Sequence, residues 1–275
     1  MVANMSPASL AQAFDDGGLS PYRSVRRCIT THQQATDSPA RMDVLWEALR
    51  DAAELIARAD PELLRIAGLS LAISAVATAL AGSIGIPLGI ALHLGRFVGR
   101  GPATLLVNAG MGLPPVLVGL LLTLMLWRTG PLGSLGLLYT PTAMVIAQVI
   151  VALPLIAGFT HAAISLLEPD LAAAMRADGA SEPRMGFELA RAAQPQVLVA
   201  VAAGFGRAIS EVGASLMVGG NIVGQTRILT TAIALETGRG DFSLALALGF
   251  ILLLLALGVN ALLGLAATTR SVRLR

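Results

Sequence analysis

Five long stretches of this chain consist almost entirely of apolar residues, and most of its charged residues lie outside them. Each stretch is close to the roughly 20 residues that an α-helix needs to cross about 30 Å of hydrocarbon. The pattern therefore predicts an all-α membrane protein with about five transmembrane helices. The predicted spans cover residues 66–94, 103–126, 142–163, 196–219 and 243–267.

Prolines fall inside three of these spans. Pro114 and Pro115 interrupt the second span, and Pro154 is expected to kink the third. The first span is long enough to tilt or to bend at Pro87.

The chain before the first span has a different pattern. Residues 1–41 are polar and irregular and lack the apolar core of a secretory signal, so we expect a disordered tail. We hypothesise that the gene prediction is over-extended and that Met42 is the true start. Apolar residues in 42–64 recur at three- and four-residue spacing, which predicts an amphipathic helix at the membrane interface with Trp46 among the headgroups.

Composition supports a helical membrane protein. Hydrophobic residues make up 55% of the chain and charged residues 13%, and the mean hydropathy is +0.74. A soluble domain carries about twice that charged fraction. Aromatic residues make up only 4%, whereas an outer-membrane barrel has aromatic girdles.

The charged residues exclude several kinds of chemistry. All 19 basic residues are arginine, and a P-loop or a Schiff base requires a lysine. The chain therefore has no Walker site of its own and is not expected to be an enzyme. Cys28 is the only cysteine, and the three histidines show no metal-ligand spacing, so we expect no metal or bound cofactor.

Arginine placement predicts the orientation. Arginines concentrate in the loop after the first span, in the loop after the third and in the C-terminal tail, which therefore belong on the cytoplasmic side. An odd number of spans then places the N-terminus outside, although the arginines before residue 65 oppose that placement.

The cytoplasmic loop 168–193 is too long for a simple connection and has the pattern of two helices. Pro169 suits the first turn of one helix, Gly179 its left-handed end, and Ser181 the cap of a second helix entered through Glu182. Such a helix–Gly–helix elbow is suited to docking another protein, or to packing as an amphipathic loop on its own bundle.

This elbow resembles the coupling loop of ABC importer permeases, whose motif is Glu-Ala-Ala, three residues, then Gly. Gly179 stands at the motif's Gly, and Ala173, Ala174 and Met175 stand at the Glu-Ala-Ala positions without the acidic residue. The resemblance implies contact with an ATPase through a set of elbow residues: Ala173, Arg176, Asp178, Gly179, Ser181 and Glu182.

The fourth span resembles the permeases for molybdate, sulfate and tungstate. Its sequence from Arg207 reads Arg-x-x-x-Glu-x-Gly-Ala-x-x-Met, followed by Gly-Asn-Ile and Thr-Arg. The continuation Leu-Thr-Thr-Ala-Ile-x-Leu-Glu-Thr is most similar to the tungstate branch, with molybdate and sulfate as the alternatives.

The resemblance covers the chain from about Met42 to the C-terminus and implies a type I importer (MetI-like) permease domain over residues 65–270. It further implies a homodimer, a separate cytoplasmic ABC ATPase that holds ATP and Mg, and an extracytoplasmic binding protein that delivers the oxyanion. The implied location is the inner membrane of a bacterium or archaeon, in a multi-pass arrangement and without nucleic acid.

Arg207 and Glu211 are charged residues within an apolar span, four residues apart on one predicted helix face. They could form a structural ion pair, Arg207 could face the passing oxyanion, or the pair could break between transport states. Together with Gly213 and Asn221, they are our candidates for the translocation path or its gate. Three further polar residues within spans are expected to make interhelical hydrogen bonds: Asn108, Gln148 and Asn260.

Two other classes of function compete. An intramembrane enzyme could pair Ser210 or Ser215 with His161, but no Gly-x-Ser-x-Gly elbow is present. A secondary transporter or channel would often show inverted repeats, which five spans do not supply.

Overall fold

The computed structural model describes residue 46, residues 49–50, 53–54, 56–58, 61–95, 97–167 and 169–272. The predicted tail 1–41 lies outside the described residues, as does much of the predicted helix 42–64. All elements discussed below belong to one compact unit, Ala48–Arg275.

The prediction of an all-α protein with about five spans is confirmed. Three helices are long and apolar enough to cross a membrane singly, and two bent helix pairs bring the number to five if each pair is one span. The single helices are α4 (Pro61–Leu94), α7 (Pro141–Ser165) and α13 (Phe242–Val272). The first of them begins before the predicted span and includes residues 61–64, which we had placed in the interfacial helix.

The two remaining spans are broken. The second consists of α5 (Arg100–Met111) and α6 (Pro115–Leu126), which meet at 103° where Pro114 and Pro115 interrupt the chain. The fourth consists of α10 (Gln194–Ile209) and α11 (Gly213–Gly219), which meet at 56°. The first break follows from the prolines, whereas the second was not predicted. In contrast, Pro87 and Pro154 lie inside continuous helices.

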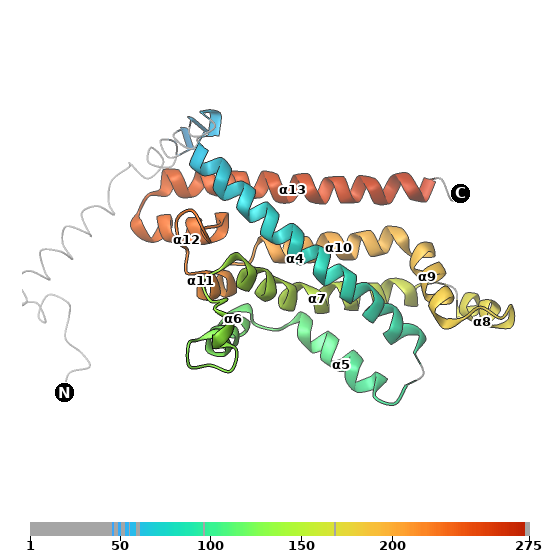
Figure 1. The fold of residues 1–275 in the computed structure, drawn as a ribbon. Coiled ribbons are helices and arrows are strands. Elements are labelled where there is room, and N and C mark those ends of the chain that lie inside the picture. Colours follow the sequence, from blue (N-terminus) through green and yellow to red (C-terminus); the bar gives the residue numbers. More distant parts are fainter. Residues whose placement is uncertain are drawn as a thin grey trace, which may run out of the picture. The chain divides into compact units, whose positions relative to one another are not determined.

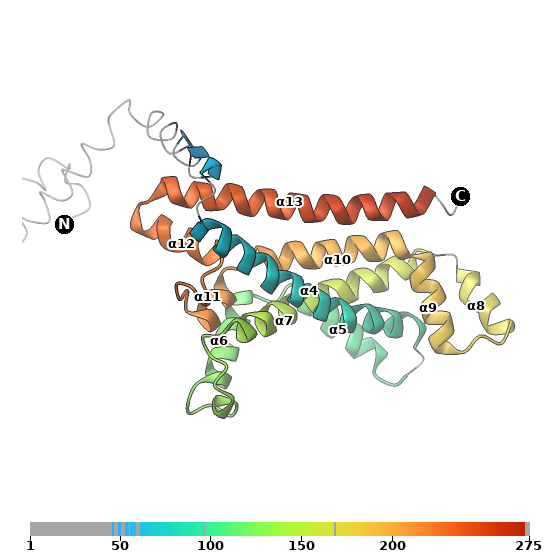
Figure 2. The same cartoon turned by 45° about the horizontal axis from the view of Figure 1, so that its top comes forward.

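Short helices lie at the two ends of the spans. At one end, α8 (Pro169–Ala177) and α9 (Glu182–Ala192) lie beside the C-terminal end of α4, and we call this the inner end (Figures 1 and 2). At the opposite, outer end lie α6, α11 and α12 (Leu229–Arg239), with the 3-10 turn η2 (Gly133–Leu135) between α6 and α7.

Close packing of α4 against α7 forms the centre of the unit. A Cβ atom built on Gly89 would lie 2.5 Å from the carbonyl oxygen of Ala157, so only glycine permits this approach. Small residues at helix interfaces are typical of membrane bundles, where van der Waals contact is the main attraction. The outer half of the core joins α4, α6, α7 and α11 through a cluster of apolar residues: Ile73, Leu126, Ala143, Met144, Ala147, Ala214, Val218 and Ile228.

Large apolar side chains also remain on the surface. Along α13 they include Leu253, Leu254, Leu257, Leu262 and Leu265. Exposed apolar surface of this extent requires lipid or another subunit to cover it.

Candidate functional site

The inner end carries the predicted elbow. After α8 ends at Ala177, Gly179 adopts a left-handed conformation with φ of 76°, and Ser181 takes the N-cap position of α9. The helix–Gly–helix prediction for this segment therefore matches the structure, except that the Ser181 side chain makes no capping hydrogen bond.

The buried face of α9 holds the elbow on the bundle. Met185 and Leu189 are fully buried in a cluster that also contains the C-terminal end of α4, and Gly186 lies directly against Ile90. In this way α9 contacts the ends of α4, α7 and α10 together.

The predicted docking residues lie on the opposite, exposed side of the elbow. Ala173, Asp178, Gly179 and Ser181 are exposed to solvent. The other two predicted residues bridge the elbow, because Arg176 Nε donates to Glu182 Oε1 at 3.4 Å. An exposed ion pair of this kind contributes at most about 1 kcal/mol, so it holds the elbow only weakly.

In the fourth span, Glu211 occupies the break. Its Oε2 accepts a hydrogen bond from Arg207 Nη1 at 3.3 Å, and its Oε1 accepts one from the backbone N–H of Ala214 at 3.0 Å. The carboxylate thus holds the last turn of α10 and the first turn of α11 together. The hydroxyl of Thr230 donates to the Glu211 carbonyl oxygen at 2.9 Å, which ties α12 to the same point.

Burial differs between the two charged partners. The Glu211 side chain is 3% exposed and that of Arg207 is 32% exposed. The predicted ion pair is therefore present, with its negative partner enclosed by the protein and its positive partner reaching the surface of this chain.

Glycines bring α11 against α6. A Cβ atom on Gly213 would lie 2.7 Å from Val116 Cγ2, and one on Gly119 would lie 2.7 Å from Ala214 Cα. Gly213 was predicted as a candidate for the path or gate, and the structure places it in the contact between the outer halves of the two broken spans.

Asn221 lies apart from this group, in the turn between α11 and α12. It has a positive φ of 52° and follows Gly220, also left-handed. The turn is closed around Thr226, whose hydroxyl donates to the Gly219 carbonyl oxygen at 2.5 Å and accepts from the Ile222 N–H at 3.0 Å. Thr226 is fully buried. Asn beside Gly is a turn signal, but the hydroxyl's role is not visible in sequence.

Within the described part of the chain, none of the three expected interhelical hydrogen bonds is found. Asn260 donates to the Ala256 carbonyl oxygen of its own helix at 2.8 Å, so that expectation is wrong. Gln148 is fully buried between helices, and neither of its amide atoms has a partner among the described residues. Asn108 is exposed on α5.

The serine–histidine alternative has no support in the geometry. The ring of His161 faces that of His93, with centroids 5.9 Å apart. The Ser210 hydroxyl donates to the Gly206 carbonyl oxygen of its own helix at 2.7 Å. Within the described part of the chain, no hydrogen bond joins His161 to Ser210 or Ser215, and no group of three His, Cys, Asp or Glu residues could hold a metal ion.

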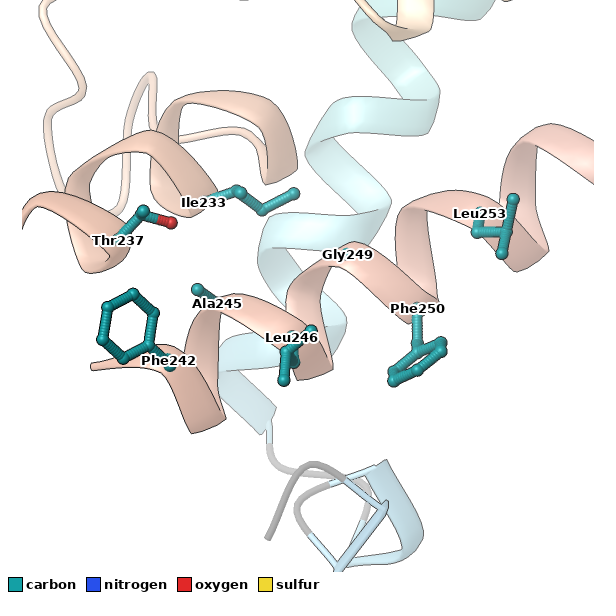
Figure 3. A pocket seen from close by; sticks show the side chains of 8 residues that line it. All are labelled: Ile233, Thr237, Phe242, Ala245, Leu246, Gly249, Phe250 and Leu253. Atoms are coloured by element: carbon teal, nitrogen blue, oxygen red, sulfur yellow. The ribbon is translucent and has the colours of Figure 1, made fainter. Parts of the chain in front are cut away.

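A groove of about 390 Å³ lies between α12 and α13 (Figure 3). Thr237 supplies the single hydroxyl in its lining, and no charged residue contributes to it, so its chemistry suits an apolar group and not an anion. Its lining comprises Ile233, Thr237, Phe242, Ala245, Leu246, Gly249, Phe250 and Leu253.

Residues 85–270 match the family described as "Binding-protein-dependent transport system inner membrane component". A "Probable anion ABC transporter permease protein" of Haloferax volcanii is 42% identical over 205 residues, which are 73% of this chain and 88% of that protein. A "Tungstate uptake system permease protein" of Peptoclostridium acidaminophilum is 38% identical over 222 residues, 81% of this chain and 97% of that protein.

Among solved structures, an inward-facing form of the MetNI methionine ABC transporter contains a similar chain. The TM-score is 0.59 at 19% sequence identity, over 74% of this chain and 95% of that one. This likeness concerns the fold, and it confirms the prediction of a bundle of this type.

Proposed function

This chain belongs to the family of binding-protein-dependent transport system inner membrane components, and on that premise we propose its cargo, its partners and the roles of its residues. It is a multi-pass membrane permease. We assign it to an ATP-driven importer for an oxyanion, with tungstate as the cargo. The similarity to a tungstate uptake permease over 97% of that protein's length is the observation that carries the assignment.

The permease is proposed to work as a homodimer with a separate cytoplasmic ABC ATPase and an extracytoplasmic oxyanion-binding protein. Exposed apolar residues along α13 and α6 supply surface that a second copy and lipid would cover. The chain has no lysine for a P-loop, so ATP and Mg are assigned to the partner ATPase.

The elbow is the proposed contact with the ATPase. Its exposed face is formed by small or polar residues of α8 and the Gly179 turn, which permits close docking, while its other face is seated on the ends of three spans. Movement of the ATPase would in this way reach α4, α7 and α10 without any covalent step in the permease.

Glu211 and its neighbours are proposed as the mobile joint of the path. The carboxylate links both halves of the broken span and pairs with Arg207, whose side chain is partly exposed. A guanidinium partly neutralised by Glu211 can attract a passing dianion without trapping it, which suits a conduit better than a fully exposed cation would.

The cargo assignment is tested with the purified permease–ATPase complex in lipid nanodiscs and the matching binding protein. We expect ATP hydrolysis to rise when the binding protein is loaded with tungstate, less with molybdate, and not with sulfate. Equal stimulation by sulfate would show that tungstate is the wrong cargo, and no stimulation by any loaded form would contradict the importer assignment itself.

A further inference from the structure

Two arginines at the outer end, Arg65 and Arg227, have no carboxylate partner among the described residues. Within the described part of the chain, no carboxylate forms an ion pair with Arg65 of α4 or with Arg227 of the turn before α12. Glu236 and Asp241, which flank the end of α12, have other partners: Glu236 pairs with Arg239 at 3.2 Å, and Asp241 Oδ1 accepts from the Leu244 N–H at 3.1 Å. Two positive charges are therefore available for an anion from outside the chain.

The turn between α11 and α12 contains Arg227 and lies against Arg65. Gly224 has a φ of 79°, and the Arg65 guanidinium lies so close to it that a Cβ atom would overlap Arg65 Nη2. Three residues later, the N–H of Arg227 donates at 3.0 Å to the Ile222 carbonyl oxygen, which also accepts from Gln225 and Thr226. Arg227 is thus a residue of this compact turn, and the Arg65 guanidinium lies against the turn at Gly224.

The turn itself is firmly anchored. Thr226 closes it from inside, and just beyond it the N–H of Leu229 donates to the Ser70 hydroxyl of α4 at 2.7 Å. Arg65 and Ser70 belong to the same helix, so the bond to Ser70 ties the chain just after the turn to the helix that bears Arg65. The positions of the two arginine backbones are therefore set by the fold.

Arg227 is the more unusual of the two. Arg227 is only partly exposed, and its Nε is buried without a hydrogen-bond partner among the described residues. A partly desolvated cation with an unused donor is costly unless an anion approaches it. Guanidinium groups present planar pairs of N–H donors that match the oxygens of an oxyanion.

We propose that Arg65 and Arg227 form an acceptor site for the oxyanion at the outer end of the permease. This proposal rests on the oxyanion-importer function above and names a place that the anion occupies after leaving the binding protein. The ligand class is a tetrahedral dianion such as tungstate. Arg65 is exposed and the site is open, so it holds the anion weakly and passes it inward.

The test uses the complete transporter in proteoliposomes with tungstate-loaded binding protein. The variants are Arg65→Gln, Arg227→Gln and the double change, with Arg128→Gln as the control because Arg128 belongs to a different outer loop, between α6 and α7. At saturating binding protein, we expect tungstate uptake to fall about tenfold or more in the double variant. We expect the affinity for labelled binding protein to change less than twofold, and Arg128→Gln to alter neither quantity.

A direct readout avoids dependence on transport. Phenylglyoxal modifies accessible arginines. In the permease–ATPase complex without the binding protein, millimolar tungstate should slow its reaction with Arg65 and Arg227. Peptide mass spectrometry would follow the modification. Modification of Arg128 should proceed at the same rate with and without tungstate. Absence of any protection would overturn the proposal, even if the double variant failed to fold.

Other outcomes separate the alternatives. Loss of binding-protein affinity, with normal uptake restored at saturating binding protein, would mean that the arginines bind carboxylates of that protein, and the acceptor site would be wrong. Unchanged uptake in the double variant would also refute it. If the wild-type transporter takes up no tungstate, the proposed function fails instead, and protection by another oxyanion would then decide the site by itself.

Discussion

Removing Arg207 should lower the free energy of unfolding, because the buried Glu211 carboxylate then lacks this counterion. In the Arg207→Ala variant, the 3% exposed carboxylate keeps its hydrogen bond from Ala214 but loses its only counterion among the described residues. Removing one partner of a buried pair is destabilising because the remaining charge stays away from water.

The magnitude follows from the geometry. At the observed separation of 3.3 Å and an effective dielectric constant near 20, Coulomb attraction is about 5 kcal/mol. Since a third of the Arg207 side chain meets solvent, screening reduces this to about 2–3 kcal/mol of unfolding free energy. For a chain of this size, about 5–10 °C in the midpoint of thermal unfolding would correspond to that loss.

The variant set separates stranding of the charge from loss of packing. Arg207→Ala with Glu211→Gln should recover most of the lost stability, because a neutral amide oxygen still accepts from Ala214 while no charge is buried. Arg58→Ala is the control, since Arg58 and Glu54 also form a pair four residues apart but are both largely exposed. We expect the control to shift the midpoint by no more than about 2 °C.

The assay is thermal unfolding of the purified permease, followed by intrinsic tryptophan fluorescence in one detergent. If the double variant is as unstable as Arg207→Ala, the stranded carboxylate is not the cause. If Arg207→Ala unfolds at the wild-type midpoint, the pair does not stabilise the break in the fourth span.

Three further changes test the packing, the turn and the elbow. Gly89→Ala should destabilise the fold by about 1–3 kcal/mol because its Cβ would overlap the Ala157 carbonyl oxygen. Gly68→Ala in the same helix should be neutral or slightly stabilising, since a Cβ there has no atom within 4 Å. Thermal unfolding of both variants checks this. Thr226→Val should cost about 1–3 kcal/mol, since the Gly219 carbonyl oxygen and the Ile222 N–H lose their partner, and an unchanged midpoint would contradict the role of the hydroxyl. Gly179→Val should weaken ATP hydrolysis stimulated by the binding protein more than Gly179→Asn does, because asparagine tolerates the left-handed conformation and valine does not. Equal effects of the two changes would show that the left-handed backbone at Gly179 is unimportant.

Local sequence signals account for most of the fold. The spans follow from the apolar stretches, the break between α5 and α6 from Pro114 and Pro115, and the elbow from Pro169 and Gly179. Each of these features depends on residues close together in the chain, so composition and spacing are sufficient to predict it.

The break in the fourth span depended on interactions that spacing alone does not reveal. Arg207 and Glu211 have helical spacing, so the segment looked like one continuous helix. In the structure, Glu211 also accepts from Ala214 and its backbone accepts from Thr230, which replaces the helical hydrogen bonds lost at the bend. The local sequence, an acidic residue shortly before Gly213 and Ala214, is compatible with a continuous helix or with a break. Tertiary contacts decide between the two.

The acceptor site at the outer end could not be predicted for a related reason. Arg65 and Gly224 are far apart in sequence, and their contact depends on how α4 passes the turn before α12. Gln148 shows the converse error, because a polar residue in a span was expected to find a partner on another helix and has none among the described residues.

Uphill uptake by reconstituted components tests the central claim most directly, namely that this chain is a passive conduit driven by a separate ATPase. Proteoliposomes would contain the permease alone, the permease with the ATPase and internal ATP, or the latter with added binding protein, and accumulated tungstate would be measured. We predict accumulation above the outside concentration only with all the components present. Accumulation against a gradient by the permease alone would contradict the account.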